Sequence, residues 1–141
     1  MDGAGDDPDV RLFVYGTLRS AADTPEPVAA LLRRTSERAG SARIRARLFD
    51  AGGFPAAIPS EEAEVVGDLL RLRRPDRTLA ALDRYEGCGG RDPLFRREEA
   101  PVRREAGGRA TAWVYFWCRP VAGLREIPSG DWLAAGGGTG G

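Results

Sequence analysis

The feature that most constrains the fold is an alternation of apolar and basic side chains within residues 41–49. The apolar members are Ala42, Ile44, Ala46 and Leu48, and the basic members between them are Arg43, Arg45 and Arg47. A period of two residues puts successive side chains on opposite faces of a β-strand. The segment is therefore predicted to be a strand with one face on a core and a basic face in solvent.

Further segments have the β-branched and aromatic composition of strands. They cover residues 10–15, 64–72, 95–103 and 109–118, with a connection like that of a hairpin between the last two. Residues 54–59 form a short extended piece after Gly52 and Gly53. Its prolines cannot donate a sheet hydrogen bond, which favours a position at an edge or rim.

Two helices are predicted, over about residues 26–38 and 76–86. The second begins after Pro75, carries Asp76 in its first turn and ends at Gly87. Helical spacing puts Leu79, Leu82 and Tyr85 on its buried face.

The strands follow one another without regular crossover helices, which argues against a doubly wound parallel sheet. The prediction is an α+β fold, a small β-barrel or strongly curled sheet with two packed helices. A chain of 141 residues fits one domain. We place that domain at residues 10–135, after an acidic, loose leader at 1–9 and before a glycine-rich, disordered tail at 136–141.

Composition narrows the classes of function. Lys+Arg and Asp+Glu both number 21, and this zero formal charge argues against nucleic acid as a partner. No apolar run approaches the roughly 20 residues of a membrane span, and the acidic N-terminus is unlike a signal peptide. We expect a cytoplasmic protein that acts on a small molecule; its oligomeric state is not predicted.

Metal and cofactor chemistry is not expected. The chain has no histidine, and Cys88 and Cys118 are too few and too far apart for a metal cluster or a disulfide framework. Carboxylates, hydroxyls and backbone groups are left to carry out any chemistry.

The first candidate site is the turn Tyr15, Gly16, Thr17 and Leu18 at the end of the first strand. A glycine after a buried strand lets the chain turn sharply, so that successive backbone N–H groups can cradle a substrate carboxylate. Thr17 adds a hydroxyl. A plain turn that ends a strand explains the same residues, and both interpretations stay open at this level.

The second candidate is Glu86, which follows Tyr85 at a helix C-terminus and precedes Gly87. The helix dipole disfavours a negative charge there, and burial would add to that effect, which suits a group that exchanges a proton near neutral pH. The alternative is an exposed glutamate on a solvated helix end.

The third candidate is the aromatic strand 113–117, in which alternation separates the odd-numbered aromatic residues from Val114 and Phe116. Tyr115 on an inward barrel face would supply a hydroxyl near a ligand. The alternative is ordinary packing.

Taken together, the motifs resemble those of the γ-glutamylcyclotransferase-like superfamily, which includes γ-glutamylamine cyclotransferases and plant avirulence-induced proteins. VYGTLR, GFPA, VVGDLL, LDRYEG, Phe95-Arg96 and AWVYFW occur in that family's order, over residues 10–118. The resemblance implies a small mixed barrel with a central cavity. It implies that Tyr15, Gly16, Thr17 and Leu18 bind the α-amino and carboxylate ends of a γ-glutamyl group, and that Glu86 is the acid/base.

The reaction implied by the resemblance is an intramolecular cyclisation to 5-oxoproline that releases an amine, without metal or cofactor. Two features depart from the family pattern: Phe95 stands where a tyrosine is expected, and the loop 88–93 is particular to this chain. Two other functions remain open. The cavity could hold a small amphoteric ligand without catalysis, or the enzyme could remove a γ-glutamyl protecting group from a biosynthetic intermediate.

Overall fold

The computed structural model describes residues 10–15, 26–85, 87, 91, 93–132 and 134. Its elements in chain order are β1 (Val10–Val14), α2 (Glu26–Thr35), β2 (Ser36–Asp50), β3 (Pro55–Leu72), α3 (Pro75–Tyr85), β4 (Phe95–Arg104), β5 (Arg109–Trp117) and β6 (Arg125–Glu126).

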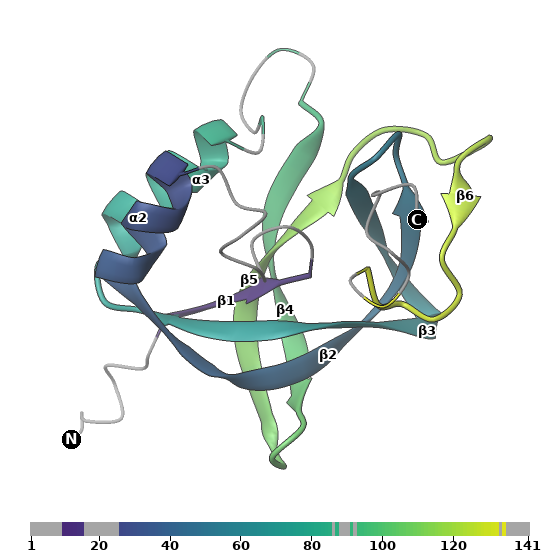
Figure 1. Cartoon of the computed structure of the whole chain (residues 1–141). Coiled ribbons are helices and arrows are strands. Elements are labelled where there is room, and N and C mark those ends of the chain that lie inside the picture. Colours follow the sequence, from purple (N-terminus) through teal and green to yellow (C-terminus); the bar gives the residue numbers. More distant parts are fainter. Residues whose placement is uncertain are drawn as a thin grey trace.

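Five of the strands close into a barrel. They are hydrogen-bonded in the order β3, β1, β5, β4, β2, and a second edge of β2 pairs with β3 to complete the ring. The β1–β5 pair is parallel and the other pairs are antiparallel. The two helices lie side by side against one side of the barrel (Figure 1). The predicted α+β fold, a small mixed barrel with two packed helices, is confirmed.

The alternating segment 41–49 lies within β2, which extends over Ser36–Asp50. Its apolar members are almost completely buried, each with at most 2% of its surface exposed. The Gly52-Gly53 turn joins β2 to β3. Both of its glycines have positive φ, and the Asp50 carboxylate accepts their N–H groups at 3.0 and 2.7 Å.

The two extended pieces predicted after this turn belong to one strand, β3. Arg45 pairs with Glu64, but the next residue, Ala46, pairs with Pro59. Residues 60–63 are therefore extra on β3, and this irregularity is what made the sequence resemble two strands.

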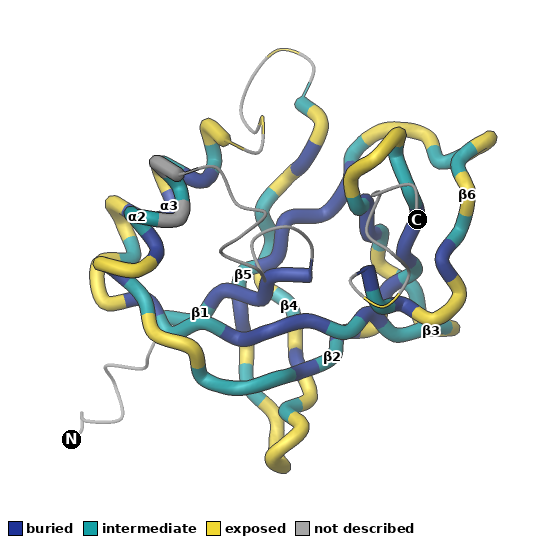
Figure 2. Tube along the Cα trace, viewed as in Figure 1, coloured by how far each residue is buried: buried dark blue, intermediate teal, exposed yellow. Residues whose placement is uncertain are grey.

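Two layers of apolar side chains hold the fold together. Figure 2 shows that buried residues lie along the barrel strands. The interior layer fills the barrel, and its members include Phe13, Tyr15, Ile44, Leu48, Val65, Leu69, Val102, Val114, Phe116, Ile127 and Trp132. The outer layer lies between the barrel and the helices, and its members include Leu12, Val14, Leu32, Leu72, Leu79, Leu82, Phe95, Tyr115 and Trp117. A sheet with buried residues on both faces explains why β5 lacks an apolar–polar alternation.

The helices differ from the prediction in two details. The first ends at Thr35, not near 38, because the chain passes directly into β2. In α3, Leu79 and Leu82 are buried as predicted, but Tyr85 is 41% exposed. Thr78 completes the buried face and donates to the Thr35 hydroxyl at 2.7 Å. Tyr85 is the last residue of the helix, one turn beyond that face.

The segment after β6 closes part of the barrel. Ile127 donates its N–H to Leu48 at 2.7 Å, and Val66 donates to the Gly130 carbonyl at 2.8 Å. Ile127 and Trp132 belong to the interior layer, so residues near the C-terminus form part of the core. No helix in the described part of the chain is long and apolar enough to cross a membrane.

Candidate functional site

Tyr15, directly after β1, ties three strands together. Its buried hydroxyl donates to the carbonyl oxygen of Tyr115 on β5 at 2.5 Å. The Tyr15 hydroxyl oxygen in turn accepts the main-chain N–H of Ala57 on β3 at 3.4 Å. The ring stacks on Phe13 with centroids 6.3 Å apart. The end of β1, where the predicted substrate turn begins, is thus fixed against the neighbouring strands.

Tyr115 itself does not face the barrel interior, which corrects the sequence interpretation. Its side chain belongs to the outer layer under the helices, while the neighbouring Val114 and Phe116 fill the barrel. Because β5 is buried on both faces, alternation could separate its two sets of side chains but could not say which set points inward. The Tyr115 hydroxyl donates to the Asp83 carboxylate on α3 at 2.7 Å.

Asp83 is the centre of a polar cluster that sequence reasoning missed. Arg97 on β4 donates to both of its oxygens, Nε to Oδ1 at 2.8 Å and a terminal nitrogen to Oδ2 at 3.0 Å. The Arg97 guanidinium also lies over the ring of Trp113, 4.5 Å from the centroid. Arg97 and, to a lesser extent, the Tyr115 hydroxyl lower the pKa of Asp83, against partial burial that raises it.

The strand register explains why these groups meet. Arg97 and Tyr115 are direct partners across β4 and β5, so both side chains project from the same place toward α3. A bidentate arginine–carboxylate pair adds geometric specificity to the electrostatic attraction. The cluster fixes the last turn of α3 against the barrel.

The residues on both sides of Glu86 are hydrogen-bonded to β4 or to the residue just before it. Asp83 holds the last turn of α3, and Gly87 donates to the Arg84 carbonyl at 3.2 Å with φ of +75°. Leu94, next to β4, donates to the Gly87 carbonyl at 3.4 Å. The glycine that was predicted to end the helix does so in the left-handed conformation that glycine favours.

The predicted site residues fall into two groups. Tyr15 and Tyr115 are brought together by the hydrogen bond described above. Gly16, Thr17, Leu18 and Glu86 lie outside the described residues, as do the expected leader and tail. The substrate turn and the catalytic glutamate therefore stay predictions. Among the described residues, no group of three or more potential ligands is placed to hold a metal ion.

Comparison with known proteins decides the family. The model of the family described as "Gamma-glutamyl cyclotransferase, AIG2-like" matches residues 12–134. The chain belongs to this family. It is similar to the γ-glutamylcyclotransferase family protein YtfP of Escherichia coli K12, with 32% identity over 127 residues that cover 88% of this chain and 96% of YtfP.

Solved structures of similar proteins have the same fold. The solution structure of E. coli YtfP covers 90% of this chain and 99% of its own, with 30% identity and a TM-score of 0.63. The crystal structure of a mouse AIG2-like protein has only 20% identity but a TM-score of 0.67, covering 87% of this chain and 88% of its own. The barrel with two helices is the γ-glutamylcyclotransferase-like fold.

The family motif LDRYEG contains Asp83 as well as Glu86, but no role was predicted for Asp83 from the motif. The signal that could have identified it is the Arg97–Tyr115 register, which requires knowing how β4 and β5 pair. Phe95, where a tyrosine was expected, packs in the outer layer. Its ring centroid lies 5.4 Å from that of Trp117 and 6.4 Å from that of Phe54. Its ring completes an aromatic group next to the GFPA turn.

Asp83→Asn is expected to lower the free energy of unfolding by about 1–2 kcal/mol near pH 7, since a charge-assisted pair at a partly exposed position is lost. The folded-state pKa of Asp83 is lowered, so its stabilisation is present above the pKa of the unfolded state, near 4, and is lost as pH falls through the folded-state pKa. Urea unfolding at several pH values should show the two proteins converging below about pH 4. A constant difference down to pH 2 would contradict the assignment.

Proposed function

We propose that this chain cyclises a γ-glutamyl compound to 5-oxoproline, releasing an amine or amino acid. The observation that carries the proposal is the family match, because its span, residues 12–134, includes both the Tyr15–Leu18 turn and Glu86. The cluster of Asp83, Arg97 and Tyr115 supports it, since a general base must be held in a defined position.

The chemistry needs one acid/base group. The α-amino nitrogen of the substrate attacks the γ-carbonyl carbon, which forms the five-membered ring, and the bond from that carbon to the leaving nitrogen breaks. An α-amine is mostly protonated at pH 7, so a base must first remove a proton. Glu86 takes this proton and passes it to the departing nitrogen, and the ring nitrogen loses a second proton, which the released amine carries at pH 7. Nucleophile and electrophile belong to one molecule, and the enzyme gains rate by holding the curled conformer.

The substrate's ends require different partners. Backbone N–H groups of the turn at Tyr15, Gly16, Thr17 and Leu18 bind the α-carboxylate, for which no cationic side chain is needed. Glu86 lies next to the α-amino group. Tyr15 anchors the turn through its hydrogen bonds to β5 and β3, and Tyr115 anchors the glutamate-bearing end of α3 through Asp83.

The test is a screen of γ-glutamyl amines and γ-glutamyl dipeptides for 5-oxoproline release, followed by mass spectrometry. At least one compound is expected to be turned over, and its Nα-acetylated counterpart is expected to be inert because its nucleophile is blocked. Saturable binding of these compounds without any turnover would favour a non-catalytic binding protein. If none of the compounds is bound and none is turned over, the proposed function is refuted.

A further inference from the structure

A pocket lies between β2 and β4, away from the end of the barrel that carries Tyr15 and Tyr115. Its volume is about 320 Å³, and its lining residues are Arg43, Ile44, Arg45, Glu61, Glu64, Pro101, Val102, Arg103 and Arg109. Arg109 and Tyr115 are six residues apart along β5, which is about 20 Å. The pocket is thus separate from the site proposed for cyclisation.

The pocket exists because two barrel strands diverge. β2 and β4 pair at only two positions, Ala42 with Arg104 and Arg43 with Arg103. Beyond them the strands separate, and two residues of the barrel core, Ile44 and Val102, lie beneath the opening. The floor is apolar and the walls are charged.

The walls carry an arrangement of like charges that a sheet normally avoids. Arg43 is the direct partner of Arg103 across β2 and β4, and Arg103 is the direct partner of Arg109 across β4 and β5. Three arginines therefore form a row across three adjacent strands. Like charges directly opposite each other destabilise a sheet, so the row has a cost unless anions lie beside it.

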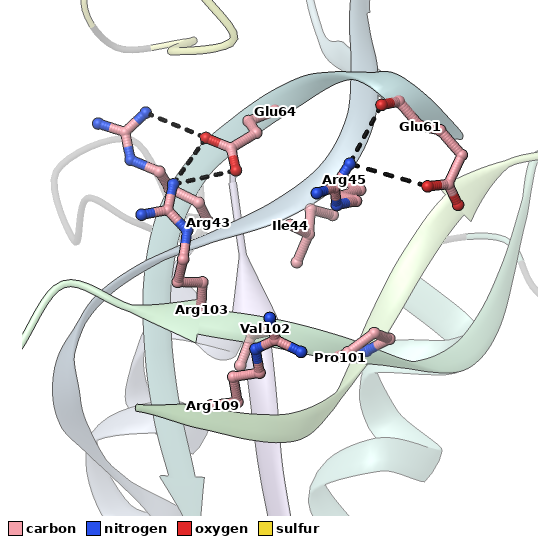
Figure 3. A pocket seen from close by; sticks show the side chains of 9 residues that line it. All are labelled: Arg43, Ile44, Arg45, Glu61, Glu64, Pro101, Val102, Arg103 and Arg109. Atoms are coloured by element: carbon pink, nitrogen blue, oxygen red, sulfur yellow. Dashed lines mark hydrogen bonds and ion pairs between the residues drawn. The ribbon is translucent and has the colours of Figure 1, made fainter. Parts of the chain in front are cut away.

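Glutamates of the protein neutralise only part of this charge (Figure 3). Glu64 accepts from Arg103 at 2.8 and 3.0 Å and lies 3.9 Å from Arg43, which also donates to Glu105 at 2.7 Å. Arg45 lies 3.7 Å from the Glu61 carboxylate. Arg109 has no acidic partner among the described residues, so its charge is not balanced by a carboxylate of the lining.

We propose that this pocket binds a small phosphorylated molecule. Its phosphate oxygens would lie between Arg103 and Arg109 and compete with Glu64 for Arg103. A planar guanidinium group matches the geometry of a phosphate and can donate two parallel N–H bonds to two of its oxygens. A volume of about 320 Å³ is at the small end of ligand pockets, which suits a diphosphate or phosphate monoester rather than a polymer.

The experiment titrates the full-length protein with inorganic pyrophosphate by calorimetry at constant ionic strength. Saturable binding is expected, weakened about tenfold in Arg109→Ala and in Arg103→Ala, since each loses a charge-assisted contact. Glu64→Gln is expected to bind more tightly, because the competing carboxylate is gone. Arg77→Ala, on the exposed face of α3, is the matched control and should bind like the wild type.

Three results would overturn the proposal: no saturable binding, equal affinity in Arg109→Ala and Arg77→Ala, or weaker binding in Glu64→Gln while its melting temperature is unchanged. Melting curves without ligand show whether each variant folds. Because 5-oxoproline release is measured separately at the other end of the barrel, failure of either proposal leaves the other intact.

Discussion

Replacing Glu86 by glutamine is expected to reduce 5-oxoproline release at least about a hundredfold on any substrate that the wild type turns over. The amide keeps the volume of the carboxyl group but can neither remove a proton from the α-amine nor return one to the leaving nitrogen. The loss should fall mainly on kcat, since the carboxylate of the substrate is still held by the turn.

Glu62→Gln is the matched control, the same change at an exposed position on β3, and should retain full activity. The melting temperature of Glu86→Gln should stay near that of the wild type, which separates loss of chemistry from loss of fold. If Glu86→Gln released 5-oxoproline at a nearly normal rate, Glu86 would not be the base.

Gly130→Ala is expected to destabilise the protein by about 3–5 kcal/mol or prevent folding. A methyl group at this position would lie 1.9 Å from the Glu64 carbonyl oxygen and 3.0 Å from its carbon, and φ is +70°. The obstruction is backbone, so it cannot rotate away. The Gly130 carbonyl also accepts from Val66 at 2.8 Å, and Ile127 and Trp132 on either side fill the barrel.

Gly107→Ala isolates the cost of placing alanine in a backbone conformation with positive φ. Gly107 has φ of +113° but nothing within 4 Å of the added methyl group. This change should lower the free energy of unfolding by only about 1–2 kcal/mol. Urea unfolding measures both changes. Equal losses in the two variants would mean that the segment after β6 does not pack tightly against β3.

Local patterns in the sequence predicted the elements well, and the reason is physical. The alternation in 41–49 follows from the pleat of one strand, and Pro75 and Gly87 mark helix ends by their own backbone preferences. The mixed barrel was then predicted from the resemblance to the family motifs. Closure of the ring by β2 and β3, and the parallel β1–β5 pair, depend on contacts between distant residues that no local period encodes.

The errors have the same origin. Tyr115 was given an inward direction, but a strand buried on both faces has no polar side to orient it. Tyr85 continued a helical period that ended one turn earlier in the packing. Asp83 was passed over because its partners, Arg97 and Tyr115, come together only through the β4–β5 register.

A crystal structure of Glu86→Gln with a γ-glutamyl substrate tests most directly whether two segments about seventy residues apart form one site. The substrate carboxylate should lie within about 3 Å of backbone nitrogens in the Tyr15–Leu18 turn. The side chain of residue 86 should lie on the order of 4–8 Å from the Gly16–Leu18 backbone, facing the α-amine across the same cavity. A residue 86 that points to solvent more than roughly 12 Å from Gly16 would contradict the account.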